Sequence, residues 1–249
     1  MDSDVDHTKR LYDQYASTHF DHTPVMRKAA YTQMARFYRA NYSHLLPADR
    51  ATPIAELGCG AGHFLYFLRQ EGYTNVSAVD LSPEMVATCH KLGFDQVELG
   101  DVISFLERHP TGFGAIICND LIEHIPRSQM IRFVESARAA LTAGVFVVKT
   151  INASSLFGAR EVFIDFTHEV GFTPESLAQV LRLGGFVDVA VRPLHTAPTT
   201  WRGHALRFVQ KAVIETLLKA LIFVLEGQGS RQPVVLTSTM LAAASSERT

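Results

Sequence analysis

A glycine-rich stretch is the sharpest chemical signal in the sequence. Gly58-Cys59-Gly60-Ala61-Gly62 follows a short apolar run, and Glu56 stands just before it. Glycines in such a turn let the backbone bend tightly and let a ligand approach the chain closely. The GxGxxG fingerprint of nicotinamide dinucleotide sites would need a third glycine at His63, and the spacing here is GxGxG. We therefore predict a ligand-binding turn of another type.

Two further acids follow the next two apolar runs. Asp80 comes at the end of residues 76–79, and Asp101 comes just after residues 96–99. A carboxylate at the end of the second strand can accept two hydrogen bonds from ribose hydroxyls. Asp101 can reach the exocyclic amine of an adenine, with Val102 packed on the ring. The simpler interpretation is that these are three solvated acids beside a glycine turn. Their places at successive strands disfavour that interpretation.

A second group of residues could handle a proton or a metal. Asp120, Glu123 and His124 have the spacing i, i+3 and i+4, which places them on one face of a helical turn. His168 lies in a later segment, residues 165–169. Both segments are expected at the carboxyl ends of neighbouring strands, where ligands bind in α/β sheets.

Three interpretations of this group stay open. His124 or His168 is a general base that is neutral near pH 7 and takes a hydroxyl proton. Alternatively Asp120, Glu123, His124 and His168 bind one divalent cation, for which Mg²⁺, Mn²⁺ and Fe²⁺ all suit mixed oxygen and nitrogen ligands. In the third interpretation Glu123 and His124 only cap a turn, and His168 only orders a loop.

Alternating strand and helix patterns must position these groups. Short apolar runs predict strands at residues 54–57, 76–79, 96–99, 115–118, 145–149, 186–191 and 233–239. Helices are predicted over most of residues 1–50, with Tyr31, Met34, Ala35, Tyr38 and Tyr42 at helical spacing, and at 62–70, from 82, from 101, 127–141, 173–184 and 205–225. Such alternation is typical of βαβ units and of a parallel sheet covered on both faces.

As a set, the motifs resemble those of the class I S-adenosylmethionine-dependent methyltransferases. Residues 56–62 resemble the first motif of that family, 79–82 the second, 100–102 the third and 119–125 the fourth. The resemblance implies S-adenosylmethionine as cofactor, with its methionine part against the glycine turn, its ribose on Asp80 and its adenine beside Asp101. The predicted cofactor-binding residues are Glu56, Gly58, Cys59, Gly60, Gly62, Asp80, Leu81, Asp101, Val102 and Asn119.

The resemblance also implies an overall architecture. We expect an α/β, doubly wound, mostly parallel sheet of seven strands whose last strand is antiparallel, in a single domain. Residues 1–50 would form an N-terminal helical cap, 51–192 the cofactor-binding core, and 193–249 a helical insert and the last strand. About 40 residues separate the last two predicted strands, where the family usually has a simple hairpin.

O-methylation fits the fourth motif better than N-methylation. Asn119-Asp120-Leu121-Ile122 lacks the prolines and the aromatic residue of the motif found in methyltransferases of amino groups on DNA bases and glutamine. The expected acceptor is therefore a hydroxyl of a sugar, a glycan or another small metabolite.

Two other functions stay open. The D-x-x-E-H pattern with a distant His resembles the metal site of small-RNA terminal 2′-O-methyltransferases, and partly that of ubiquinone-pathway enzymes. The RNA enzymes have Glu where this sequence has Asp120. A metal-dependent RNA 2′-O-methyltransferase is thus one alternative, and a non-catalytic scaffold that binds S-adenosylmethionine is the other.

Composition and charge restrict partners and location. The chain has 249 residues, 47% of them hydrophobic, and a net charge of -2 from 23 Lys+Arg and 25 Asp+Glu. Such a balance disfavours nucleic acid as a partner, because bulk positive charge drives that binding. The three cysteines (Cys59, Cys89 and Cys118) form no CxxC pair, and the polar start MDSDVDHTKR is unlike a signal peptide, so we expect a cytoplasmic protein.

The predicted helix at 205–225 has three candidate roles. It begins beside Trp201, Arg202, His204, Arg207 and Lys211, and is apolar further along. Covering the core and forming a homodimer are favoured, because a helix this apolar is usually buried in protein. Peripheral membrane contact is the third candidate, since basic residues and Trp beside an apolar face suit a membrane surface.

Overall fold

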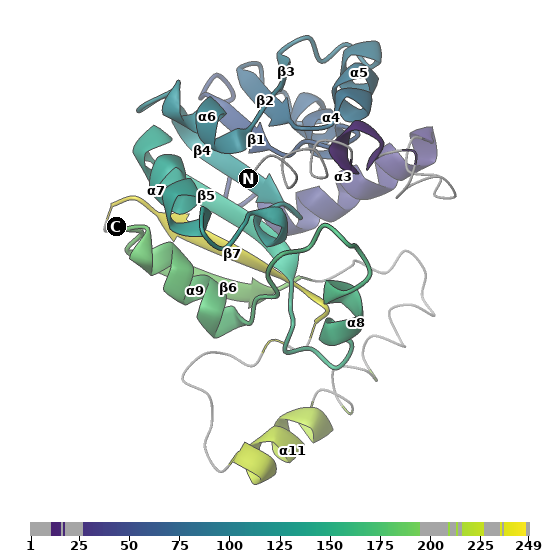
Figure 1. Cartoon of the computed structure of the whole chain (residues 1–249), viewed down its shortest axis with the longest axis vertical. Coiled ribbons are helices and arrows are strands. Elements are labelled where there is room, and N and C mark those ends of the chain that lie inside the picture. Colours follow the sequence, from purple (N-terminus) through teal and green to yellow (C-terminus); the bar gives the residue numbers. More distant parts are fainter. Residues whose placement is uncertain are drawn as a thin grey trace, which may run out of the picture.

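One seven-stranded sheet organises the chain. The computed structural model describes residues 11–15, 17, 27–194, 209, 213, 216–226, 235 and 237–247. Its strands are β1 (Ile54–Leu57), β2 (Val76–Asp80), β3 (Val97–Leu99), β4 (Phe113–Asn119), β5 (Leu141–Ile151), β6 (Asp188–Pro193) and β7 (Thr239–Ser245). The order is β3-β2-β1-β4-β5-β7-β6, and only β7 runs antiparallel to its neighbours (Figure 1). The predicted doubly wound, mostly parallel sheet is therefore confirmed.

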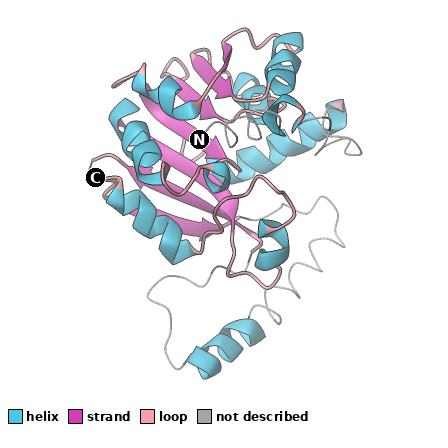
Figure 2. Ribbon diagram, viewed as in Figure 1, coloured by secondary structure: helices cyan, strands magenta, loops and turns pink. Residues whose placement is uncertain are grey.

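Helices cover both faces of this sheet (Figure 2). The described helices are α3 (Lys28–Tyr42), α4 (His63–Gln70), α5 (Pro83–Lys91), α6 (Val102–Glu107), α7 (Met130–Ala140), α8 (Gly158–Val162), α9 (Pro174–Leu183) and α11 (Thr216–Glu226), with a 3-10 turn η2 (Ile122–His124) after β4; of these, α11 lies apart from the sheet (Figure 1). Ala115 and Ile117 of β4 belong to the cluster with α3 and α4, whereas Ile116 and Cys118 belong to the cluster with α6, α7 and α9. Because alternate residues of a strand point to opposite faces, this central strand must be apolar throughout.

Most predicted elements up to residue 193 are present within a few residues of their expected bounds. The predicted strand at 54–57 coincides with β1, and the helical spacing in the first 50 residues corresponds to α3, which buries Tyr31, Ala35, Tyr38 and Tyr42. The last strand is a correction. We expected it at 233–239, but β7 spans Thr239–Ser245. Its small, alanine-rich residues have low strand propensity, and burial between β5 and β6 outweighs it.

The helical insert is described only in part. Trp201, Arg202, His204, Arg207 and Lys211 lie outside the described residues. The described large side chains of α11 are exposed, so the expectation that this helix covers the core is wrong for them: Leu217, Leu221, Phe223 and Val224. Self-association and membrane contact stay predictions. Among the described residues, every helix is too short or too polar to cross a membrane.

Candidate active site

The carboxyl ends of the central strands open into one large pocket. Its volume is ≈ 790 Å³. All the predicted cofactor residues except Gly62 line it, and so do Asp120, Glu123, His124 and His168. Both predicted groups of functional residues therefore meet in a single cavity, as expected for strand ends that share one edge of a parallel sheet.

The glycine turn between β1 and α4 uses backbone conformations that favour glycine. Gly58, Gly60 and Gly62 have φ values of 65°, 51° and 78°, in the left-handed region. A Cβ on Gly58 would lie 3.0 Å from the Leu121 side chain, whereas one on Gly60 would meet nothing within 4 Å. Gly62 directly precedes α4, and a Cβ on it would lie 3.0 Å from the Cys89 sulfur instead of entering the pocket. The turn therefore presents bare backbone and open space to the cavity at Gly60.

Asp80 is held rigidly at the end of β2. Its Oδ2 accepts a hydrogen bond from the Gly60 backbone N–H at 2.7 Å, and its Oδ1 accepts one from Ser82 N–H at 2.8 Å. Burial raises the pKa of Asp80, and these N–H donors oppose that rise. The carboxylate thus links the glycine turn to the second strand at the position predicted for a ribose.

Glu56 adds an unsatisfied acceptor to the same wall. It is 2% exposed, and its Oε2 has no hydrogen-bond partner among the described residues. Burial raises the pKa of this carboxyl group. A buried polar atom without a partner usually indicates a ligand or a water, so Glu56 fits an ammonium group such as that of a methionine moiety.

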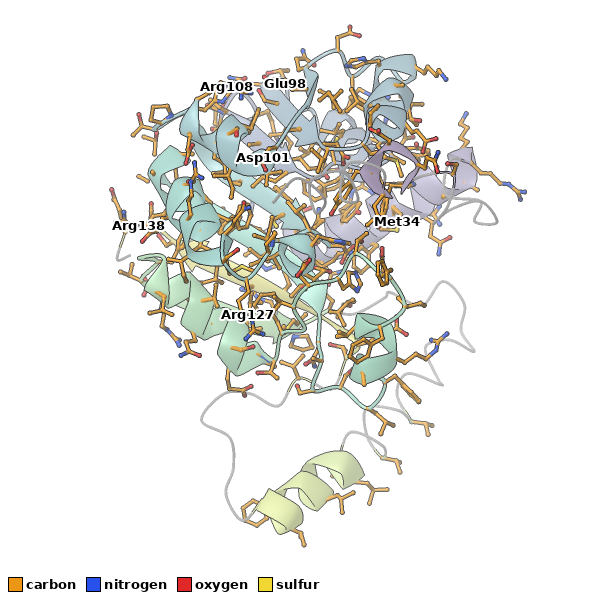
Figure 3. All side chains as sticks on the ribbon, viewed as in Figure 1. Met34, Glu98, Asp101, Arg108, Arg127 and Arg138 are labelled. Atoms are coloured by element: carbon orange, nitrogen blue, oxygen red, sulfur yellow. The ribbon has the colours of Figure 1, made fainter. Side chains whose placement is uncertain are left out.

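The predicted adenine end is assembled from β3 and α6. Asp101 lies in the connection between them (Figure 3), and its Oδ1 caps α6 by accepting from Ser104 N–H at 2.8 Å. Val102 is buried and Leu81 is half-exposed. All three residues line the pocket, which gives it apolar side chains beside an acid at this end.

Asp120 and Glu123 have separate partners. The turn η2 contains only Ile122–His124, so the expected helical face shared with Asp120 is not formed. Asp120 has a φ of 49°, and its carboxylate forms an ion pair with Lys149 at the end of β5. Glu123 Oε2 accepts from the Thr150 hydroxyl at 2.8 Å, and burial, followed by the charge of Asp120, raises the Glu123 pKa to about 8.

His124 and His168 do come together. Their ring centroids are 4.7 Å apart, although the residues lie on different segments. Burial, followed by repulsion from His168, lowers the pKa of His124 to about 4, so its imidazole is neutral near pH 7. Backbone hydrogen bonds from Glu169 and Val170 to the Glu123 carbonyl fix the two segments against each other.

Asp165 is a third group near the two imidazoles; the sequence placed it in the same segment as His168 but not in the predicted metal set. One potential ligand atom from each of His124, Asp165 and His168 lies within 4.8 Å of the other two. This trio differs from the predicted metal set, because Asp165 takes the place of Asp120 and Glu123. Two imidazoles and one carboxylate are a donor set that suits Mn²⁺ or Fe²⁺.

The N-terminal segment contributes residues that no local pattern indicated. Leu11, Tyr12 and Tyr15 line the pocket. The Tyr15 hydroxyl donates to Asp165 Oδ2 at 2.7 Å, and the Tyr15 ring lies edge-on to His124. Burial raises the pKa of Tyr12 to about 12. Aromatic residues near a chain start are common, so only the folded chain distinguishes these two.

Together the fold and the pocket define a class I S-adenosylmethionine-dependent methyltransferase. The residues fit that cofactor, since the turn is open at Gly60, Glu56 offers an unpaired buried oxygen, and Asp80 stands at the end of β2, where the ribose is predicted. The family described as a methyltransferase domain matches residues 30–191, and the chain belongs to it.

Two curated relatives are O-methyltransferases by name. A ubiquinone biosynthesis O-methyltransferase of Xylella fastidiosa is 30% identical over 105 residues, covering 40% of this chain and 42% of the relative. The match therefore spans less than half the length of that relative. A malonyl-[acyl-carrier protein] O-methyltransferase of Pectobacterium atrosepticum is 28% identical over 234 residues, covering 86% of this chain and 82% of the relative.

Solved structures support the fold. A SAM-dependent methyltransferase from Archaeoglobus fulgidus superposes with a TM-score of 0.63 at 19% identity, covering 86% of this chain and 94% of that one. A possible histamine N-methyltransferase from Thermotoga maritima gives 0.60 at 16% identity, covering 96% and 98%. At such identities the likeness concerns the fold alone.

Proposed function

We propose that this chain is an O-methyltransferase that methylates a hydroxyl of a sugar, a glycan or another small metabolite, with His124 as general base. The observation that carries the proposal is a neutral imidazole in the same pocket as the glycine turn. A hydroxyl acceptor must lose its proton as it attacks, and a neutral histidine can take it.

The reaction needs alignment more than covalent help. When bound, S-adenosylmethionine supplies an electrophilic methyl group on a sulfonium, and the thioether that remains is a good leaving group. The pocket walls then have to hold the acceptor oxygen in line with that methyl group. Tyr12, Tyr15 and Phe166 line the pocket, and such rings can pack against a sugar face or another planar group.

Two further points support oxygen as the accepting atom. Residues 119–122 lack the prolines and the aromatic residue of the methyltransferases that act on amino groups of DNA bases and of glutamine. Both kinds of curated relatives named above are O-methyltransferases. Their acceptors differ, so the names support the reaction type more than any single acceptor.

The proposal can be tested with purified protein and S-adenosylmethionine carrying a labelled methyl group. A panel of sugars, phenols, other alcohols, amines and carboxylic acids is screened for methyl transfer. With an accepted hydroxyl compound, we expect His124→Gln to lower turnover by about 10²–10⁴-fold while cofactor affinity stays within about twofold. Transfer to amines alone, or full turnover by His124→Gln, would refute the proposal.

A metal-assisted form of the same reaction is the second candidate. It is favoured by the trio His124, Asp165 and His168, whose donors would hold a divalent cation that lowers the pKa of the acceptor hydroxyl. Dialysis against a chelator, followed by addition of Mg²⁺, Mn²⁺ or Fe²⁺, separates the two forms. Full turnover after chelation supports the histidine base, and a loss that a cation restores supports the metal.

A further inference from the structure

The contacts around His124 deepen the proposed function, on which this inference rests. We infer that Thr167 and Asp165 are positioning residues that hold His124 in one tautomer, with its proton on Nδ1 and its lone pair on Nε2. Neither residue was assigned a role from the sequence. The arrangement would prepare Nε2 to accept the acceptor's proton.

A chain of short hydrogen bonds determines the tautomer. The Thr167 hydroxyl oxygen lies 2.7 Å from Asp165 Oδ1 and 2.9 Å from His124 Nδ1. A hydroxyl has one proton to donate, and an ionised carboxylate can only accept. Thr167 therefore donates to Asp165, so the remaining contact requires His124 Nδ1–H to donate to the Thr167 oxygen.

Asp165 is well supported in its role as an acceptor. The Thr167 backbone N–H donates to the same Oδ1 at 2.8 Å, and Tyr15 donates to Oδ2 at 2.7 Å. The residue is 8% exposed. Hydrogen bonds from three donors favour the ionised carboxylate, which then has no proton to return to Thr167.

The same reasoning separates the two histidines. His168 Nδ1 lies 2.8 Å from the Val162 carbonyl oxygen, which can only accept, so His168 also carries its proton on Nδ1. The Nδ1 of His168 is hydrogen-bonded to a neutral carbonyl oxygen. The Nδ1 of His124 is hydrogen-bonded to a hydroxyl that itself donates to a carboxylate. A carboxylate linked to an imidazole stabilises the imidazolium formed when the ring accepts a proton. Of the two, only His124 is linked through a hydroxyl to a carboxylate that could stabilise its protonated form.

The tautomer can be measured without any acceptor. The full chain is prepared with ¹⁵N-labelled histidine, and the His124 signals are assigned by their loss in His124→Gln. Long-range ¹H–¹⁵N spectra then report which ring nitrogen is protonated. We expect a protonated Nδ1 and an unprotonated Nε2 in the wild type and in Thr167→Ser, which keeps the hydroxyl, and a mixture of tautomers in Thr167→Val.

Turnover provides the second readout. Valine has nearly the same shape as threonine but no hydroxyl. We expect Thr167→Val to lower kcat by about tenfold or more with KM for S-adenosylmethionine unchanged. Thr167→Ser should stay within about threefold of the wild type. Asp165→Asn keeps an oxygen for Thr167 and removes the charge, so it should preserve the tautomer and still lower kcat.

The outcomes separate this inference from the function on which it rests. An Nε2-protonated wild type, or a Thr167→Val variant with unchanged tautomer and unchanged kcat, would overturn the inference. If Thr167→Val loses the tautomer while His124→Gln keeps full turnover, the positioning by Thr167 stands and the proposed general base is wrong.

Discussion

Gly60 illustrates how a single backbone position serves the pocket. Its φ is positive, a Cβ there would meet no protein atom within 4 Å, and it lines the cavity. Gly72 also has a positive φ and open space around a Cβ, but it lies in the turn after α4 and outside the pocket lining. The pair therefore offers a matched comparison.

We predict that Gly60→Ala and Gly72→Ala lower the free energy of unfolding similarly, by about 1 kcal/mol, because both place alanine in a left-handed conformation. Only Gly60→Ala should weaken S-adenosylmethionine binding, by about tenfold or more, since its methyl group enters the pocket. Urea unfolding and titration calorimetry measure the two effects. Equal affinities in both variants would contradict the placement of the cofactor.

His124 makes stability depend on pH. Burial, followed by repulsion from His168, lowers its pKa from 6.5 to about 4 in the folded protein. The unfolded chain therefore binds a proton at higher pH than the folded chain. The stability associated with this neutral imidazole is present above pH 6.5 and is lost as the pH falls toward 4.

We predict that lowering the pH from about 7 to about 5 lowers the free energy of unfolding of the wild type by roughly 1–2 kcal/mol more than that of His124→Gln. Urea unfolding of both proteins at the two pH values measures the difference. An equal loss in both proteins would show that His124 is not protonated more readily on unfolding.

At the scale of elements, the junction between β5 and the following segment depends on Asn152. This residue is fully buried, and its Nδ2 donates to the carbonyl oxygens of Val235 and Thr237 at 2.7 Å and 3.0 Å. Its Oδ1 accepts from the Ser154 hydroxyl at 2.6 Å. One amide thus joins the chain before β7 to the segment that carries Asp165 and His168.

We predict that Asn152→Ala lowers the free energy of unfolding by about 2–4 kcal/mol, because several buried groups lose their hydrogen-bond partner. Ser154→Ala removes one exchangeable contact of the same amide and should cost less than about 1 kcal/mol. Chemical unfolding of both variants measures the costs. If both variants lose the same stability, Asn152 does not hold the junction.

The elements also differ in how well the sequence predicts them. The bounds of β1 follow from a short apolar run between polar residues, and the spacing of Pro174 and Gly184 predicts α9. The helix α8 was not predicted, since its five residues have no repeating apolar pattern. A Cβ on Gly158 would lie 2.4 Å from the Asn152 carbonyl oxygen, so tertiary contact, more than local preference, shapes this segment.

For the whole molecule, ligand binding should be coupled to folding. The pocket is lined by residues from the N-terminal segment to β7, so a bound ligand contacts much of the folded chain. S-adenosylhomocysteine, the demethylated cofactor, at 100 times its Kd should add about 2.7 kcal/mol to the free energy of unfolding. A rise of several degrees in the thermal midpoint is expected for the wild type, and at the same ligand concentration a rise of about half that size or less for Gly60→Ala. A wild-type midpoint that does not move would contradict cofactor binding in this pocket.

The amino-acid sequence by itself determined the first six strands of the sheet, the glycine turn and nearly all the residues expected at the cofactor. These features depend on local patterns, because each functional residue directly follows its own strand and the strands end at one edge. On the acceptor side, His124 and His168 were predicted, and only the tertiary structure decided which residues support them. Tyr15 comes from the distant N-terminal segment, and Asp165 and Thr167 come from a loop without a repeating pattern. Their polar groups are paired with each other and with His124 because groups that become buried on folding need hydrogen-bond partners, and those partners are distant in sequence.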